Sequence, residues 1–193
     1  MSATRIDNLV QWRAPGLDYS HRPLEALEGV LIHRSITPDP SPEGLASLFL
    51  DEMGWSCVPY TFYCWGGVLY QMAPLAAHTP HAGHLNPRWA SVAIHGDERP
   101  GGGPRFALLD ALSAQTIVGL LAWIFDWSAN SIEGHSNKVT SKQWPDKECP
   151  GSLFNLSMFR LSAAKQAGTH PKSILTYPER FEYARSCGLR INT

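Results

Sequence analysis

The sequence predicts a single α/β domain in which a mixed β-sheet is flanked by helices. Its 193 residues are enough for one domain with a substantial buried core. Short apolar runs typical of strands alternate with longer segments of helical periodicity, which favours helices packed on the faces of a sheet. A Gly-Gly pair between two β-prone runs predicts a hairpin, so the sheet is not wholly parallel.

The first half of the chain supplies the predicted strands and one helix. Gly29 to His33 is a short apolar run that ends in a polar residue, as expected of a buried strand with His33 at its C-terminal end. Ser41 fits a helix N-cap because Pro42 can occupy the first helical position, and this helix should run to about Met53. The hairpin strands and a further strand are expected at 60–65, 68–72 and 90–95.

The second half is expected to be mostly helix and loop. The longest predicted helix, 113–127, carries apolar residues at helical spacing that form a buried face. Residues 73–88 and 128–151 are rich in polar, Gly and Pro residues and are interpreted as loops. Shorter helices are expected at 154–164 and 179–186, and residues 1–27 are interpreted as an irregular arm packed on the domain.

The charge and hydropathy patterns disfavour two classes of partner. Sixteen Lys and Arg balance 17 Asp and Glu, so the chain lacks the basic excess typical of nucleic-acid binding. Its longest apolar run, Ile117 to Phe125, is too short to span a bilayer, and no apolar stretch of signal-peptide length follows the N-terminus. We therefore expect a chain that is synthesised in the cytoplasm without a signal peptide, binds no nucleic acid and does not insert into a membrane. We also expect a monomer, although no pattern in the sequence indicates the oligomeric state.

Three residues in separate segments are of the types that bind zinc: His33, His135 and Cys149. A catalytic zinc site uses three protein ligands of this kind and leaves one position open for water. Spacing alone is weak support, because eight His and four Cys allow many other triples.

The order of the motifs around these residues is more specific. A strand ends in His33, Tyr60 precedes the hairpin, His81-Ala-Gly is followed by Asn86, and the segment closes with Gly134-His135 and Lys147-Glu-Cys149-Pro-Gly. Over about residues 28 to 155 this order resembles the zinc-dependent N-acetylmuramoyl-L-alanine amidases. That family includes phage lysozyme-type amidases, muropeptide-recycling amidases and peptidoglycan recognition proteins.

The resemblance implies an amidase/peptidoglycan-recognition-protein-like fold and a complete assignment of roles. One Zn²⁺ would be bound by His33, His135 and Cys149, with Tyr60 and Lys147 as catalytic residues. The substrate-binding residues would be His81, Asn86, His95 and Arg34. The partner would be peptidoglycan or its muropeptides, and the bond cleaved would be the amide between N-acetylmuramic acid and L-alanine. The zinc amidase domain would occupy 28–164, between the arm 1–27 and a C-terminal extension 165–193.

The sequence departs from the family pattern at three points. Arg34 follows the first ligand, where it would contact a substrate carboxylate or face solvent. Thirteen residues separate His135 from Cys149, a few more than expected, although a loop insertion costs little free energy. His95 stands where some relatives carry a Glu, and it has either an acid/base role or none beyond the strand.

Two other functions and several places of action stay open at this point. One alternative is a peptidoglycan-binding module without catalysis, and the other is a thiol hydrolase with Cys149 as nucleophile and His33 or His135 as base. An endolysin or a delivered effector would act at the cell wall or in the periplasm, whereas a recycling enzyme would act in the cytoplasm.

Overall fold

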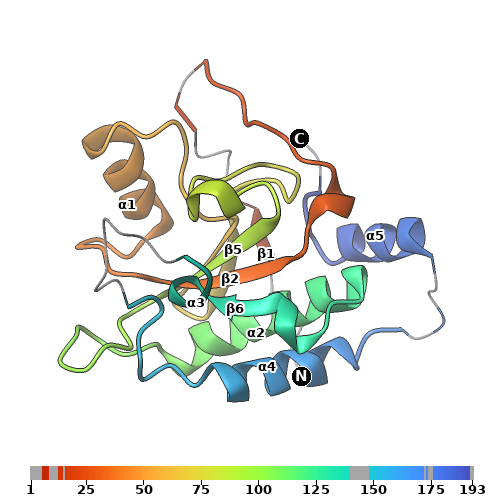
Figure 1. Ribbon diagram of the computed structural model, residues 1–193. Helices are drawn as coiled ribbons and strands as arrows, with labels where there is room; N and C mark the ends of the chain where they lie inside the picture. The colour runs from red at the N-terminus through yellow and green to blue at the C-terminus, as the bar shows by residue number, and fades with distance from the viewer. Residues whose placement is uncertain are drawn as a thin grey trace.

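The computed structural model describes residues 6–8, 13–14, 16–139, 148–171, 173 and 176–191. Within these ranges six strands form one sheet in the order β1-β4-β3-β5-β2-β6 (Figure 1). The strands are β1 (Ile6–Asn8), β2 (Gly29–Ser35), β3 (Phe62–Trp65), β4 (Val68–Gln71), β5 (Trp89–His95) and β6 (Ile132–Gly134). The α-helices are α1 (Pro42–Ser47), α2 (Leu108–Phe125), α3 (His135–Lys138), α4 (Leu156–Ala167) and α5 (Tyr177–Ser186).

The sheet is mixed, as the sequence predicts. β3 and β4 pair antiparallel across Gly66 and Gly67, which both have positive φ, so the predicted hairpin is confirmed. The other paired strands run parallel. The first helix begins as expected, because Ser41 Oγ accepts the backbone N–H of Gly44 at 3.0 Å.

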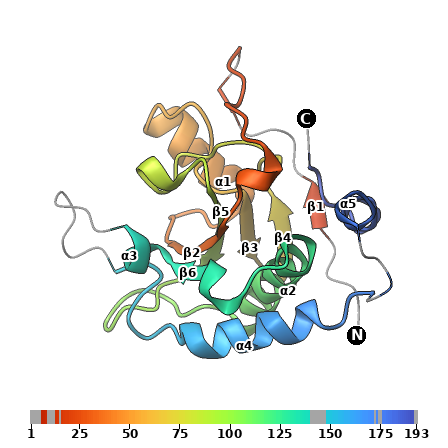
Figure 2. The same ribbon diagram turned by 45° about the vertical axis from the view of Figure 1, so that its right-hand side comes forward.

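Helices cover the two faces of the sheet unequally. α2 lies across one face with α4 and α5 packed beside it, and α1 lies over the other face (Figures 1 and 2). α2 is long and apolar enough to cross a membrane by length and composition alone, but 61% of it is buried in the fold. Packing against the sheet and its neighbouring helices therefore accounts for its apolar character.

The strand register brings two histidines next to each other. In the parallel pair of β2 and β6, Ile32 is opposite Gly134. The following residues are His33, still within β2, and His135, the first residue of α3. Two residues 102 positions apart in the chain, by subtraction of their numbers, thus meet at the edge of the sheet.

The structure corrects several expected boundaries. Residues 128–151 were expected to be loop, but they contain β6 and α3, and the arm 1–27 contributes β1 to the sheet edge. β1 and β6 have only three residues each, too few for a clear local pattern, so pairing with β4 and β2 defines them. α2 begins at Leu108, five residues earlier than expected. Its first turn is anchored by Asp110, whose carboxylate accepts the Gly67 N–H at 2.6 Å.

Candidate metal centre

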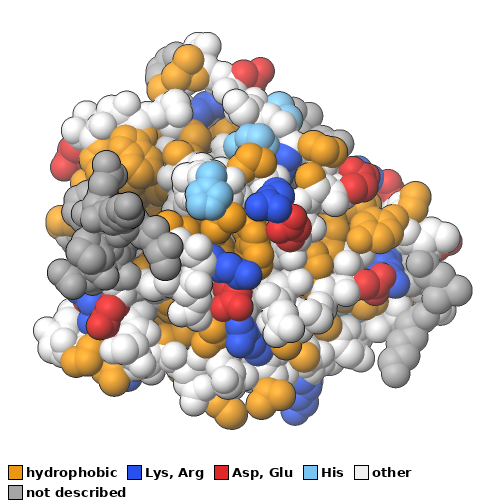
Figure 3. Space-filling view, viewed as in Figure 1, with side chains coloured by type: hydrophobic (Ala, Val, Ile, Leu, Met, Phe, Trp, Pro, Cys, Tyr) orange, Lys and Arg blue, Asp and Glu red, His pale blue; other side chains and the backbone are white. Residues whose placement is uncertain are grey.

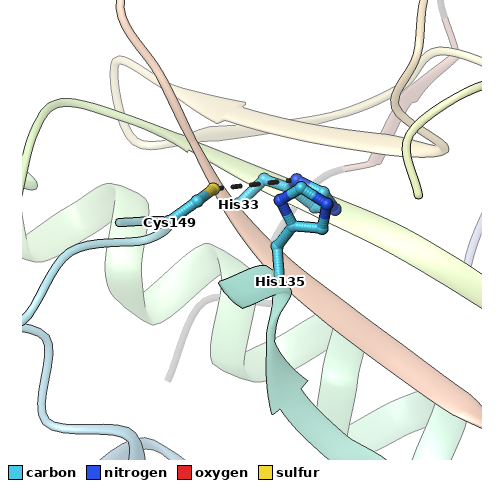
Figure 4. A group of neighbouring side chains, drawn as sticks. All are labelled: His33, His135 and Cys149. Carbon is cyan, nitrogen blue, oxygen red and sulfur yellow. Dashed lines mark hydrogen bonds between the residues drawn. The ribbon is translucent and has the colours of Figure 1, made fainter. Parts of the chain in front are cut away.

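His33, His135 and Cys149 converge in one buried cluster. Their potential ligand atoms all lie within 4.8 Å of one another. Figure 4 shows the two imidazole rings and the sulfur pointing toward a common point, with His33 on β2 and His135 directly after β6. The three side chains are 3%, 3% and 5% exposed. The structure therefore brings together the three residues that the sequence singles out as ligands.

The cluster fits a zinc ion in both chemistry and spacing. Two imidazoles and one thiol form a donor set that zinc prefers. Usual Zn–S and Zn–N bond lengths at a tetrahedral centre place sulfur and nitrogen about 3.6 Å apart. Cys149 Sγ and His33 Nδ1 are 3.8 Å apart, and the two imidazole rings stack with centroids 4.6 Å apart. Little movement is needed for these atoms to hold one metal ion.

Backbone hydrogen bonds place Cys149 opposite the histidines. Its N–H donates to Ser136 Oγ at 2.5 Å, and its carbonyl oxygen accepts the Ser136 N–H at 2.9 Å. The backbone N–H of Arg34 donates to Cys149 Sγ at 3.4 Å and so helps to fix the position of the sulfur. Gly151, with φ +127°, lies so close to Glu98 that a Cβ would come within 2.3 Å of the Glu98 carbonyl carbon. Glycine is therefore required at position 151, where the segment after Cys149 passes close to the loop that contains Glu98.

His81 does not line a groove, contrary to the expectation that it binds substrate. It is only 7% exposed and lies behind His33, with His81 Nδ1 3.1 Å from His33 Nε2. Its other nitrogen, Nε2, is 2.9 Å from the carbonyl oxygen of Trp89. Burial lowers the pKa of His81 to about 3, so the ring is neutral at neutral pH. His81 is thus buried against a candidate ligand, a position that its sequence motif does not predict.

Tyr60, the predicted catalytic residue, lies beside the cluster. Its ring centroid is 5.4 Å from that of His33, and its hydroxyl is 3.5 Å from the Arg34 carbonyl oxygen. Burial, and secondarily the proximity of Cys149, raises the pKa of Tyr60 well above its usual value. The side chain is therefore a neutral phenol that can donate a hydrogen bond near the site.

Arg34 does not face solvent but pairs with a buried carboxylate. Its guanidinium is 2.5 Å from Asp97, a carboxylate that is fully buried and also accepts two hydrogen bonds from the Arg99 guanidinium. The expectation that Arg34 faces solvent is therefore wrong, because a buried carboxylate needs this cation as a partner. A contact of Arg34 with a substrate carboxylate stays a prediction. Sequence reasoning missed Asp97, since a single Asp in a Gly-rich loop gives no local signal.

The other predicted site residues are not ligands in the cluster that the described residues form. Asn86 Oδ1 accepts the Ala82 N–H at 2.7 Å and so closes the turn after His81, and Asn86 also lines a pocket of about 290 Å³. His95 is half-buried at the end of β5, opposite Ser35, and is not part of the ligand cluster within the described residues. Lys147 lies outside the residues that the structure describes.

A pocket lies next to the cluster. A pocket of about 310 Å³ adjoins Cys149 and is lined also by Gly134, Ser136 and Phe154. On the face of the molecule seen in Figure 3, basic and acidic side chains are interspersed. A pocket next to a candidate metal ligand gives a small molecule or a chain end room to approach it.

Comparison with known proteins identifies the fold. No protein-family model and no curated protein matches the sequence. The chain is similar in structure to the N-acetylmuramoyl-L-alanine amidase LysC from Clostridium intestinale URNW, with 19% identity, 83% of this chain and 97% of LysC covered, and a TM-score of 0.64.

Two further solved structures share this architecture. The Ph2119 endolysin from a Thermus scotoductus MAT2119 bacteriophage has 17% identity over 82% of this chain and 99% of its own, with a TM-score of 0.62. Drosophila PGRP-LB has 22% identity over 89% of this chain and 98% of its own, with a TM-score of 0.59. The chain therefore has the fold of amidases and peptidoglycan recognition proteins, as the sequence predicts.

Proposed function

We propose that this chain, which has the fold of the amidases and peptidoglycan recognition proteins, is a zinc-dependent N-acetylmuramoyl-L-alanine amidase. It would cleave the amide bond between N-acetylmuramic acid and L-alanine in peptidoglycan or its muropeptides. The observation that carries the proposal is the buried cluster of His33, His135 and Cys149, whose ligand atoms lie within 4.8 Å of one another. A fold shared with amidases supports the reaction class but does not by itself define it.

The three cluster residues would hold one zinc ion. Zinc at such a site supplies Lewis acidity, which polarises a substrate carbonyl and makes water a better nucleophile. The protein contributes the placement of the donors: β2 carries His33, the end of β6 presents His135, and the bonds to Ser136 hold Cys149. A rigid donor set of this kind binds the metal without a large loss of conformational freedom.

Tyr60 would act on the reacting amide. Its neutral hydroxyl lies next to His33 and can donate a hydrogen bond to the oxygen on which negative charge develops. We assign Lys147 the role of a second cation for the same oxygen, as the family pattern implies. His95 and Asn86 would contact the substrate farther from the reacting bond.

The substrate class follows from the proposed reaction. Among the structures that share this fold, a tyrosine-to-phenylalanine mutant of Drosophila PGRP-LB has been solved in complex with tracheal cytotoxin. We propose that a muramyl peptide binds this chain at the metal cluster, with its lactyl amide beside Tyr60. The pocket of about 310 Å³ next to Cys149 would accommodate a part of this ligand.

The direct test is the release of amino groups from purified peptidoglycan by four samples. These are the wild type, the wild type after metal chelation, the chelated protein reloaded with Zn²⁺, and Cys149→Ser. We expect activity only in the wild type and the reloaded protein, with about one zinc per chain in each.

Two other outcomes would contradict the proposal in different ways. Cys149 Sγ is 3.8 Å from His33 Nδ1, a pairing that a thiol hydrolase also uses. Activity that survives chelation but not Cys149→Ser would identify Cys149 as a nucleophile. Zinc binding together with peptidoglycan binding, but without release of amino groups, would identify a recognition module.

A further inference from the structure

We propose that His81 is a positioning residue, which fixes the tautomer and orientation of His33 and thereby sets the metal affinity of the cluster. The inference rests on the proposed zinc site and extends it to a residue that binds neither metal nor substrate. Its basis is a chain of hydrogen bonds that runs from the Trp89 carbonyl through His81 to His33.

The direction of these hydrogen bonds follows from the chemistry of their ends. The carbonyl oxygen of Trp89 can only accept, so the proton of a neutral His81 ring is on Nε2, 2.9 Å away. His81 Nδ1 then carries a lone pair and accepts from His33 Nε2, at 3.1 Å. His33 is therefore protonated on Nε2, and its Nδ1 presents a lone pair on the side of Cys149 Sγ. This is the tautomer that a metal at the cluster requires.

Further hydrogen bonds hold the Trp89 carbonyl and the backbone of His81 in place. Arg22, 4% exposed, donates from its guanidinium to the carbonyl oxygens of Trp89 and Asn86, at 3.0 and 2.5 Å. The backbone N–H of His81 donates to the Thr79 carbonyl at 2.9 Å, which holds the loop from the other side. His81 is thus held through both its backbone and its side chain without a contribution from a metal.

The packing of the two rings supports the same role. His33 and His81 meet edge to face, with centroids 5.2 Å apart and an interplanar angle of 79°. This separation of the centroids agrees with the 3.1 Å contact between His33 Nε2 and His81 Nδ1. A partner that orients a metal-binding imidazole in this way typically changes metal affinity by about 10- to 100-fold.

The experiment compares three variants by competition for Zn²⁺ with a chromophoric chelator. His81→Phe keeps an aromatic ring but removes both hydrogen bonds, and we expect it to weaken Zn²⁺ affinity by about 10- to 100-fold. His81→Asn can accept from His33 through its amide oxygen and should stay within about threefold of wild type. His84→Ala is the matched control, because His84 is exposed in the same loop and should leave the affinity unchanged.

The tautomer is measured independently in the zinc-free wild type by ¹⁵N NMR of the histidine rings. A proton on His33 Nε2 supports the proposal, and a proton on Nδ1 overturns it, even if His81→Phe fails to fold. Unchanged Zn²⁺ affinity in a folded His81→Phe would also overturn it. Zinc binding without amidase activity would contradict only the proposed function, since affinity and tautomer are still measured.

Discussion

Asp97 is a buried carboxylate next to the candidate site. Its side chain is fully buried and receives the guanidinium groups of Arg34 and Arg99. Arg34 is the neighbour of the candidate ligand His33, and its backbone N–H also reaches Cys149 Sγ. The position of the strand end therefore depends on a carboxylate that takes no part in the proposed reaction.

We predict that Asp97→Asn lowers the free energy of unfolding by about 3 kcal/mol, because it leaves a largely buried Arg34 without its counter-charge. Urea denaturation of the zinc-free protein measures the change. The control is Glu28→Gln, which removes an ion pair with Arg88 that is about half exposed on both sides and should cost less than about 1 kcal/mol. Equal effects of the two substitutions would contradict the prediction.

At Tyr60 we predict a loss of activity without a loss of metal. Tyr60→Phe removes the only polar atom of the side chain and should lower kcat by about 10²-fold, while zinc content stays at the wild-type level. Tyr63→Phe is a matched control, since Tyr63 is buried and its hydroxyl donates to the Pro40 carbonyl at 2.8 Å. That control should lose stability and keep its kcat; a Tyr60→Phe enzyme of wild-type kcat would refute the assigned role.

At the scale of elements, the contact of α2 with α4 requires a glycine. A Cβ on Gly119 would lie 2.6 Å from Gln166 Cβ and 2.9 Å from the Ala163 carbonyl oxygen. Glycine inside a helix normally costs about 1 kcal/mol relative to alanine. Close packing of the two helices is therefore the reason for this residue.

Gly119→Ala should accordingly destabilise the protein, by about 1 to 3 kcal/mol, because the overlap with the α4 backbone exceeds the gain in helix propensity. Gly103→Ala provides the comparison, since a Cβ there meets nothing within 4 Å. Thermal unfolding of both variants should show a lower Tm only for Gly119→Ala. A rise in Tm for Gly119→Ala would mean that α4 does not pack as the structure shows.

The elements differ in how far the sequence predicts them. The hairpin and the strand β5 are recognisable because their apolar runs and Gly-Gly turn are local signals. β1 and β6 are short, and only their pairing with β4 and β2 makes them strands. Pairing depends on contacts between distant parts of the chain, which no local window of sequence contains.

At the scale of the whole molecule, the candidate site joins segments that lie far apart in the sequence. The identities of His33, His135 and Cys149 are predictable from residue type and motif order, and their convergence appears in the structure. The burial of His81 and the pairing of Arg34 with Asp97 were not predictable, because both depend on loops that fold against the ends of β2 and β5. Catalytic and ligand roles of these residues stay predictions.

A metal that connects these segments should stabilise the entire fold. A ligand present at about 1,000 times its Kd contributes about 4 kcal/mol to the free energy of unfolding. In a chain of this length we expect chelation to lower the Tm by on the order of 10 °C, and Zn²⁺ to restore it. In Cys149→Ser the Tm should respond little to either treatment. Differential scanning calorimetry provides the test. A wild-type Tm that changes with neither chelator nor Zn²⁺ would argue against a bound metal.

The central claim is the identity of the bond that is cleaved. Mass spectrometry of a purified disaccharide–peptide muropeptide after incubation with the zinc-loaded protein tests it most directly. Hydrolysis of the proposed bond gives two products, a disaccharide with a free lactyl carboxyl group and a stem peptide with a free L-alanine amino terminus. An intact muropeptide, or products cut within the peptide or between the sugars, would contradict it.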